Sequence, residues 1–142
     1  MKELSLNILD IAENSVSANA SLIDILVKES VLNDTMSISI TDNGKGMSEE
    51  FVKTVTDPFS TTRTTRKVGM GISLLKLVAE QSAGEFSIES QLGKGTVVTA
   101  TFKRSHIDRP PLGNIGQTIS TLVSCILGID FSYTHVFNDN EF

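Results

Sequence analysis

Residues 42–47 read Asp42-Asn43-Gly44-Lys45-Gly46-Met47, a carboxylate and two glycines placed directly after an alternating run. That run, residues 36–41, alternates apolar and polar side chains and so predicts a strand with one buried face. Asp42 would then be a fixed hydrogen-bond acceptor at the end of a buried strand. Gly44 and Gly46 would let the backbone approach a flat ring that a Cβ would block. Taken singly, such a loop is usually a turn.

Two further glycine loops occur in the chain, Gly69-Met70-Gly71 and Gly93-Lys94-Gly95-Thr96. Gly69 and Gly71 lie at the start of a predicted helix over residues 71–83, where unpaired N–H groups and the helix dipole favour phosphate. The basic residues just before that helix favour an anion site, and a solvated loop is the alternative. These residues are Arg63, Arg66 and Lys67.

The apolar stripe over residues 2–18 predicts a first helix, on which Asp10 and Asn14 share a face. Asn14 offers an amide oxygen suited to a hard cation such as Mg²⁺. Asp10 is placed to orient or deprotonate a water or hydroxyl group. A solvated helix face is the alternative for an isolated Asp–Asn pair.

The order of predicted elements favours helices layered on one face of a mixed sheet, an α+β fold. A hairpin over residues 21–42 follows the first helix, a short helix begins after Ser48, and residues 57–68 form a long loop. The 71–83 helix ends at Gly84, and strands at 85–91 and 96–103 form a second hairpin.

The composition shifts after Arg104, which predicts two units, residues 1–104 and residues 105–142. The second unit is predicted to hold an extended connector with Pro110-Pro111, an amphipathic helix over 114–128 and a strand over 131–137. That helix either packs against the first unit or forms a partner surface, including that of a homodimer, because its apolar stripe must be buried somewhere.

Bulk properties exclude several classes of protein. The single Cys125 excludes an internal disulfide framework, and the net charge of −5 disfavours general nucleic-acid binding. No apolar run reaches the roughly 18 residues that span a membrane, and residues 1–3 lack the apolar stretch of a secretory signal. We therefore expect a cytoplasmic protein without nucleic-acid or membrane partners.

The order of these segments resembles the GHKL superfamily of type II topoisomerases, Hsp90 chaperones, histidine kinases and mismatch-repair ATPases. Residues 13–20 are similar to its asparagine box, residues 42–47 to its DxGxG adenine loop, and residues 93–96 to its GxGT turn. Residues 57–63 resemble the start of the lid in histidine kinases, and residues 69–73 their second glycine loop. The resemblance covers residues 1–103.

This resemblance implies a two-layer α/β sandwich of the Bergerat type, with helices on one face of a mixed, mostly antiparallel sheet, and ATP and Mg²⁺ as cofactors. Asn14 would hold Mg²⁺, Asp42 would bind adenine with Thr96 in support, and residues 57–70 would close over the phosphates. The remaining residues implied in nucleotide binding are Gly44, Gly46, Met47, Arg63, Lys67, Gly69, Met70 and Gly71.

Two departures from the family pattern bear on activity. Asp10 stands where topoisomerases and mismatch-repair enzymes carry a catalytic Glu, so its reach is shorter by one methylene. Lys67 replaces the first glycine of GxGxG and would contact the γ-phosphate.

Three functions follow from this resemblance. The first is an enzyme, a protein serine kinase of the anti-sigma-factor type or a slow ATPase, with Asp10 as general base. The second is a nucleotide-gated regulatory module that binds a protein partner. The third is the catalytic domain of a histidine kinase, which we expect less, because a helix starting at residue 2 leaves no room for a phospho-accepting hairpin. His106 and His135 are predicted to lie in a connector and a strand, where a surface role is more common.

Overall fold

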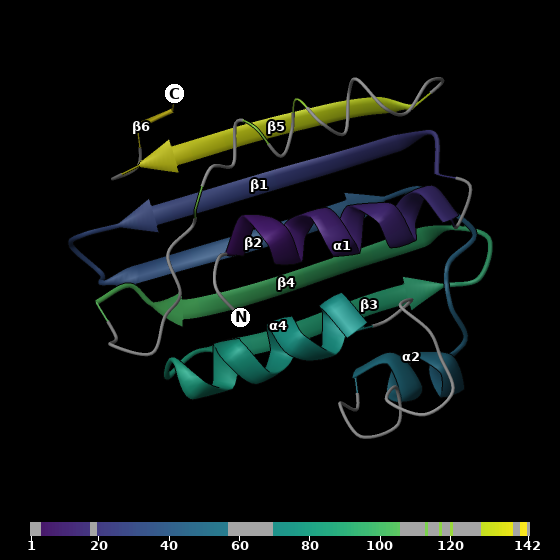
Figure 1. Ribbon diagram of the computed structural model, residues 1–142, viewed down its shortest axis with the longest axis horizontal. Helices are drawn as coiled ribbons and strands as arrows, with labels where there is room; N and C mark the ends of the chain where they lie inside the picture. The colour runs from purple at the N-terminus through teal and green to yellow at the C-terminus, as the bar shows by residue number, and fades with distance from the viewer. Residues whose placement is uncertain are drawn as a thin grey trace.

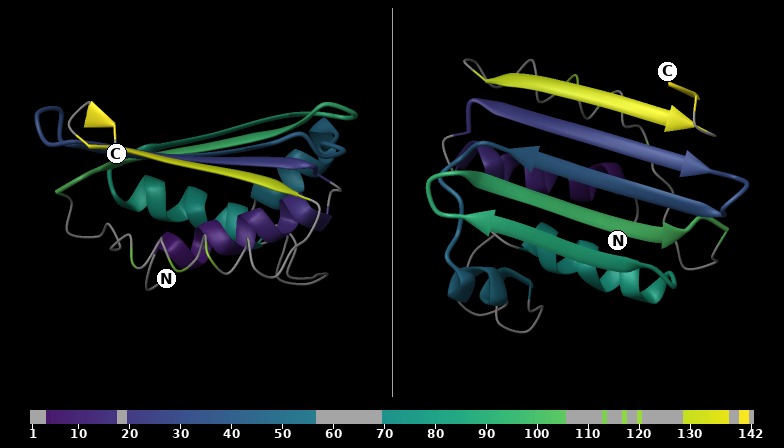
Figure 2. Two further views of the ribbon diagram at one scale, coloured as in Figure 1. Left: turned by 90° about the horizontal axis from the view of Figure 1, so that it is seen from above. Right: turned by 180° about the vertical axis from the view of Figure 1, so that it is seen from behind.

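The computed structural model describes residues 4–17, 20–56, 70–105, 113, 117, 120, 129–137 and 140–141. It confirms the α+β class, because the helices lie together on one face of a single sheet (Figure 2). In chain order the elements are α1 (Leu4–Ser17), β1 (Leu22–Ser30), β2 (Thr35–Asp42), α2 (Glu49–Thr56), α4 (Met70–Gln81), β3 (Glu85–Gln91), β4 (Gly95–Lys103), β5 (Asp130–Phe137) and β6 (Asn140–Glu141).

The sheet has the strand order β3-β4-β2-β1-β5-β6 and is mixed, as predicted. Both predicted hairpins form antiparallel pairs, β1 with β2 and β3 with β4, and β2 pairs antiparallel with β4. β1 and β5 are parallel, with Leu22 opposite Asp130 and Glu29 opposite Phe137. The long connection from β4 to β5 allows this parallel pairing, which a tight turn does not.

The core lies between the helices and one face of the sheet. Alternate residues of the central strands point into it, including Ile25 and Val27 of β1 and Ile38 and Ile40 of β2, all essentially inaccessible. Among the residues that the structure describes, Phe102 of β4 is the largest fully buried side chain. Each such side chain contributes about 1.5–3 kcal/mol on burial, so the period-2 pattern fixes which face receives the helices.

Helices α1 and α4 pack side by side on that face (Figure 1). Leu4, Ile8 and Ile11 of α1 are buried, and so are Leu75 and Val78 of α4. Leu77 of α4, although apolar, is exposed. It lies two residues from Leu75, about 200° around the helix, and so points away from the sheet.

The residue that adopts the left-handed conformation at the C-terminal end of α4 differs from the prediction. The left-handed residue is Ala83, with φ 58°, and not Gly84. Gly84 is the next residue, and its N–H donates to the carbonyl of Ala79 at 2.8 Å, as in a Schellman motif. A Cβ on Gly84 would lie 1.6 Å from the Thr101 carbonyl oxygen, so glycine is required there by close approach to β4.

The predicted C-terminal strand is confirmed as β5, which extends the same sheet beside β1. Most of the predicted connector and of the 114–128 helix lies outside the described residues. Within that helix Gln117 and Ser120 are described, and both are helical and exposed. In the part of the chain that the structure describes, no helix is long and apolar enough to cross a membrane.

Candidate functional site

The segments singled out in the sequence come together at one end of the sheet (Figure 1). The last turn of α1, the end of β2, the start of α2, the start of α4 and the β3–β4 turn all lie there. The antiparallel register places Asp42 of β2 opposite Thr96 of β4, and Thr96 opposite Ser90 of β3. Residues that are distant in sequence thus form a row across neighbouring strands.

Asp42 and Asn43 fix the start of the 42–47 loop. Asp42 Oδ1 accepts a hydrogen bond of 2.8 Å from the Gly44 N–H, which orients the carboxylate. Asn43 Oδ1 accepts from the N–H groups of Ser21 and Leu22 at 2.8 and 3.0 Å, and Asn43 Nδ2 donates to Ser21 Oγ at 2.9 Å. The loop is therefore tied to the beginning of β1, a role for Asn43 that the glycine pattern did not indicate.

The 42–47 loop and the β3–β4 turn interlock through their backbones. Gly46 has φ 74°, and a Cβ there would lie 2.0 Å from the Gln91 carbonyl oxygen. Gly95 has φ 122°, and its Cβ would lie 2.1 Å from the Asp42 carbonyl oxygen. The Gly93 N–H donates to the Lys45 carbonyl at 2.7 Å. The missing side chain of Gly46 thus makes room for another loop of the protein, a reason for glycine that the sequence did not indicate.

Ser90 links these two loops, and sequence reasoning missed it. Its Oγ accepts from the Met47 N–H at 2.7 Å, donates to the Gly95 carbonyl at 3.1 Å and lies 2.8 Å from Thr96 Oγ1. The alternation of β3 was a usable signal, because Ser90 shares the inward face with the half-buried residues Phe86 and Ile88. A hydroxyl on a partly buried face needs hydrogen-bond partners.

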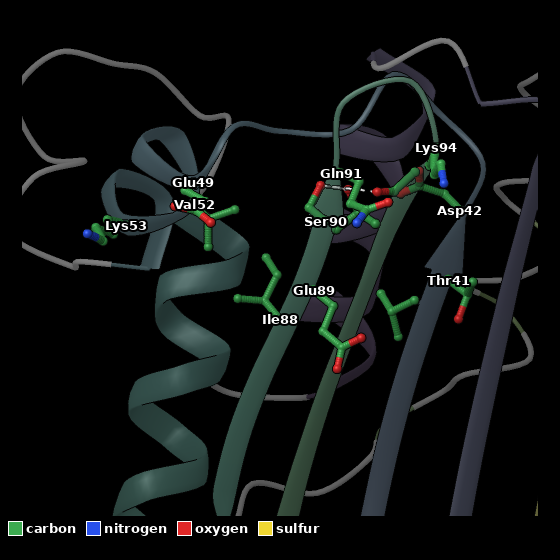
Figure 3. A pocket seen from close by; sticks show the side chains of 13 residues that line it. Thr41, Asp42, Glu49, Val52, Lys53, Ile88, Glu89, Ser90, Gln91 and Lys94 are labelled. Atoms are coloured by element: carbon green, nitrogen blue, oxygen red, sulfur yellow. Dashed lines mark hydrogen bonds between the residues drawn. The ribbon is translucent and has the colours of Figure 1, made fainter.

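A cavity of about 770 Å³ lies at this end of the sheet, a size typical of small-ligand sites (Figure 3). Asp42, Ser90 and Thr96 supply polar groups, and Val52 of α2 and Ile88 of β3 supply apolar surface. The complete lining is Thr41, Asp42, Glu49, Val52, Lys53, Ile88, Glu89, Ser90, Gln91, Lys94, Gly95, Thr96 and Val97.

Other predicted site residues lie beside this cavity or outside the described part. Gly44 and Gly46 are buried, and Met47 is half-buried against the core. Asp10 is exposed on α1 and is not part of the cavity lining. Asn14 lies in the last turn of α1, but its side chain is outside the described residues, as are Arg63, Lys67 and Gly69. Met70 and Gly71 are the first two residues of α4.

The helix ends suit an anion and its counterion. The twelve-residue α4 begins at this end of the sheet, so its first N–H groups are directed to the same region as the last turn of α1. Among the described residues, no group of three or more His, Cys, Asp or Glu side chains is placed to hold a metal ion.

Comparison with known proteins decides the family. The sequence model of the histidine kinase-, DNA gyrase B- and HSP90-like ATPases matches residues 1–106. The chain belongs to this ATPase family. The match ends just after β4, so the family domain holds the whole site described above, whereas β5 and β6 lie beyond it.

Similar proteins include several kinases. Over 76% of this chain it is 32% identical to a sensor protein from Shewanella frigidimarina, and over 71% it is 34% identical to sporulation kinase E from Bacillus subtilis. It is 28% identical, over 76% of its length, to an NtrY-like sensor histidine kinase from Rickettsia conorii. The matched regions span only 16%, 13% and 18% of those three proteins.

Proposed function

We propose that this ATPase-family domain binds Mg-ATP at the Asp42 end of the sheet and transfers the γ-phosphate to a protein acceptor. The observation that carries the proposal is the row of Asp42, Thr96 and Ser90 on the wall of the cavity. The Asp42 carboxylate, oriented by the Gly44 N–H, would accept a hydrogen bond from the adenine amino group. Ile88 and Val52 would contact the apolar faces of the base.

The triphosphate would extend from the cavity toward the start of α4. The N–H groups of the first turn, at Met70 and Gly71, are suited to phosphate oxygens. Asn14 would contribute an oxygen ligand to Mg²⁺, which when bound neutralises charge on the phosphates. Arg63 and Lys67, in the segment between α2 and α4, would pair with the phosphates.

A histidine acceptor is favoured over a serine by the relatives, one of which is named a sensor histidine kinase. An imidazole nitrogen carries a lone pair and needs no base to attack phosphorus, whereas a serine hydroxyl does. The acceptor would be a histidine of a partner protein or of another segment of a longer chain, and the reaction would take place in the cytoplasm. Dimerisation through residues 114–128 stays a prediction.

The second candidate, a serine kinase or slow ATPase, rests on Asp10. This residue is exposed on α1, one turn before Asn14, where a carboxylate would reach an attacking hydroxyl or water. A nucleotide-gated regulatory module is the outcome if neither transfer nor hydrolysis occurs.

The test follows the fate of labelled γ-phosphate from Mg-ATP in the presence of a histidine-containing or a serine-containing acceptor peptide. Wild type and Asp10→Asn are compared. The proposal predicts an acid-labile label on the histidine peptide, as expected for a P–N bond, at a similar rate in both proteins. Release of free phosphate or labelling of serine that Asp10→Asn abolishes would establish the second candidate. ATP binding without any turnover would contradict both.

A further inference from the structure

The Ser90 hydroxyl has three hydrogen-bonding neighbours at the cavity wall. These are the Met47 N–H at 2.7 Å, the Gly95 carbonyl oxygen at 3.1 Å and Thr96 Oγ1 at 2.8 Å. Figure 3 shows Ser90 on β3 with its hydrogen bonds directed toward the strand beside it. Thr96 is 9% exposed and lines the cavity directly opposite Asp42 in the strand register.

Counting hydrogens fixes the direction of the Ser90–Thr96 bond. A serine hydroxyl has one hydrogen and two acceptor lone pairs. The Met47 N–H can only donate, so it occupies one lone pair of Ser90 Oγ. The Gly95 carbonyl can only accept, so it takes the single Ser90 hydrogen. The remaining contact must use the second lone pair of Ser90, and Thr96 is therefore the donor.

This assignment sets what Thr96 offers to a ligand. Its one hydrogen is directed at Ser90, so Thr96 Oγ1 presents lone pairs to the cavity. Asp42 on the neighbouring strand is a carboxylate, which when ionised only accepts. The wall formed by Asp42 and Thr96 then accepts hydrogen bonds and donates none.

We propose that Ser90 is a positioning residue for base recognition: by holding the Thr96 hydrogen it keeps this wall free of donors. A base with an amino group at this edge is accepted, whereas a carbonyl oxygen at the same position faces only lone pairs. A carbonyl left without a donor at this wall binds more weakly than an amino group that is paired there. The inference rests on the proposed function, since it concerns the base that occupies this cavity.

The test compares the dissociation constants of ATP and ITP, which differ in bearing an amino group or a carbonyl at the base edge. Ser90→Ala frees the Thr96 hydroxyl to rotate and donate to the carbonyl of ITP. We expect the ratio of the ITP dissociation constant to the ATP dissociation constant to fall about tenfold in Ser90→Ala. This change corresponds to the free energy of one ordinary hydrogen bond. Ser90→Thr should restore the wild-type ratio, and Ser39→Ala, a serine on the opposite face of the sheet, should not change it.

A second comparison separates positioning from simple loss of structure. In a Thr96→Val background no hydroxyl remains to be oriented, so adding Ser90→Ala should leave the ITP to ATP ratio unchanged. If Ser90→Ala weakens both nucleotides equally, or changes the ratio by the same factor in the Thr96→Val background, the positioning role is wrong although the nucleotide site stands. Wild type that binds neither nucleotide would instead overturn the proposed function itself.

Discussion

The two ends of the sheet are held together by different kinds of contact. At the end that holds the candidate site, the contacts are between backbones: Gly46 packs on the Gln91 carbonyl and Gly95 on the Asp42 carbonyl. At the opposite end, long side chains join β1, β5 and the residue after β4. Glu29 bonds Arg104 Nε at 3.2 Å and His135 Nε2 at 2.7 Å. The positions of Gly46 and Gly95 therefore have no room for an added atom, whereas the long side chains at the opposite end can change their rotamers.

The side-chain end shows how such readjustment is possible. The Arg104 guanidinium lies 5.4 Å from the centroid of the Phe137 ring, and Tyr133 Oη lies 3.4 Å from His135 Nδ1. Burial, together with the Glu29 carboxylate, raises the pKa of Tyr133. Each group has more than one partner, so loss of one contact leaves others. The contrast indicates that the end with the candidate site is the less adjustable of the two.

The largest effect is expected for Gly46→Ala. Its Cβ would overlap the Gln91 backbone in a left-handed conformation, and the free energy of unfolding should fall by about 3–5 kcal/mol. Gly93→Ala is the matched control, because Gly93 also has positive φ but has no atom within 4 Å of its Cβ position. It should cost about 1–2 kcal/mol, the left-handed penalty alone.

Urea denaturation of wild type and the two variants measures both values. Equal losses for Gly46→Ala and Gly93→Ala would mean that backbone conformation, and not loop interlocking, governs this end of the sheet. The two ends of the sheet would then not differ in how tightly their contacts are packed.

A smaller effect is expected from Glu29→Ala at the other end. The substitution leaves Arg104 and His135 without their half-buried carboxylate, and the free energy of unfolding should fall by about 1–2 kcal/mol. Glu85→Ala, at an exposed position of β3, should stay within about 0.5 kcal/mol of wild type. ATP affinity should be the same in wild type and both variants. A marked loss of ATP affinity in Glu29→Ala would show that the two ends are coupled.

The smallest effect is expected from Ser105→Ala and depends on pH. The hydrogen bond from the Ser105 side chain lowers the pKa of Asp34 from its ordinary 3.8; desolvation opposes this shift, and the hydrogen bond from the Ser105 N–H adds to it. A carboxyl group whose pKa is lowered by folding stabilises the fold at pH values above its pKa in the unfolded chain. This stabilisation is lost as the pH falls through the pKa of the group in the folded protein. Ser105→Ala should therefore lower the melting temperature slightly at pH 7, and the difference should shrink below pH 3.8.

Exposed Ser132 of β5 provides the control for that measurement. Ser132→Ala should melt like wild type at every pH. A difference between Ser105→Ala and wild type that persists unchanged in strong acid would exclude Asp34 as its cause.

Much of the architecture could be predicted because it depends on local patterns. Alternation in β2 and the apolar stripes of the helices predicted the type of each element and which of its sides is buried. Ser48 caps α2, because its Oγ accepts a hydrogen bond of 3.2 Å from the Phe51 N–H. Leu77 is apolar and yet exposed, which shows that an apolar residue within a helix does not by itself reveal the side that packs. The αL position at Ala83 was missed because glycine is the usual residue there.

The candidate site was predictable only in part. Asp42, Gly44, Gly46 and Thr96 come together as expected, because they lie in loops that follow or precede paired strands. Asn43 was missed because its partners Ser21 and Leu22 lie more than twenty residues away in the sequence. The alternation of β3 placed Ser90 on the inward face, but its bond to the Met47 N–H, 43 residues away, depends on how the strands pair.

The most direct test of the nucleotide site is calorimetric titration of Mg-ATP into wild type, Asp42→Asn and Asp24→Asn. Asp24 lies opposite Thr41 in the strand register and supplies the same substitution on the other face of the sheet. We expect Asp42→Asn to weaken ATP binding at least about tenfold, which corresponds to the free energy of a hydrogen bond to a charged group. We expect Asp24→Asn to bind ATP like wild type. Equal ATP affinity in wild type and both variants would contradict the assignment of the site.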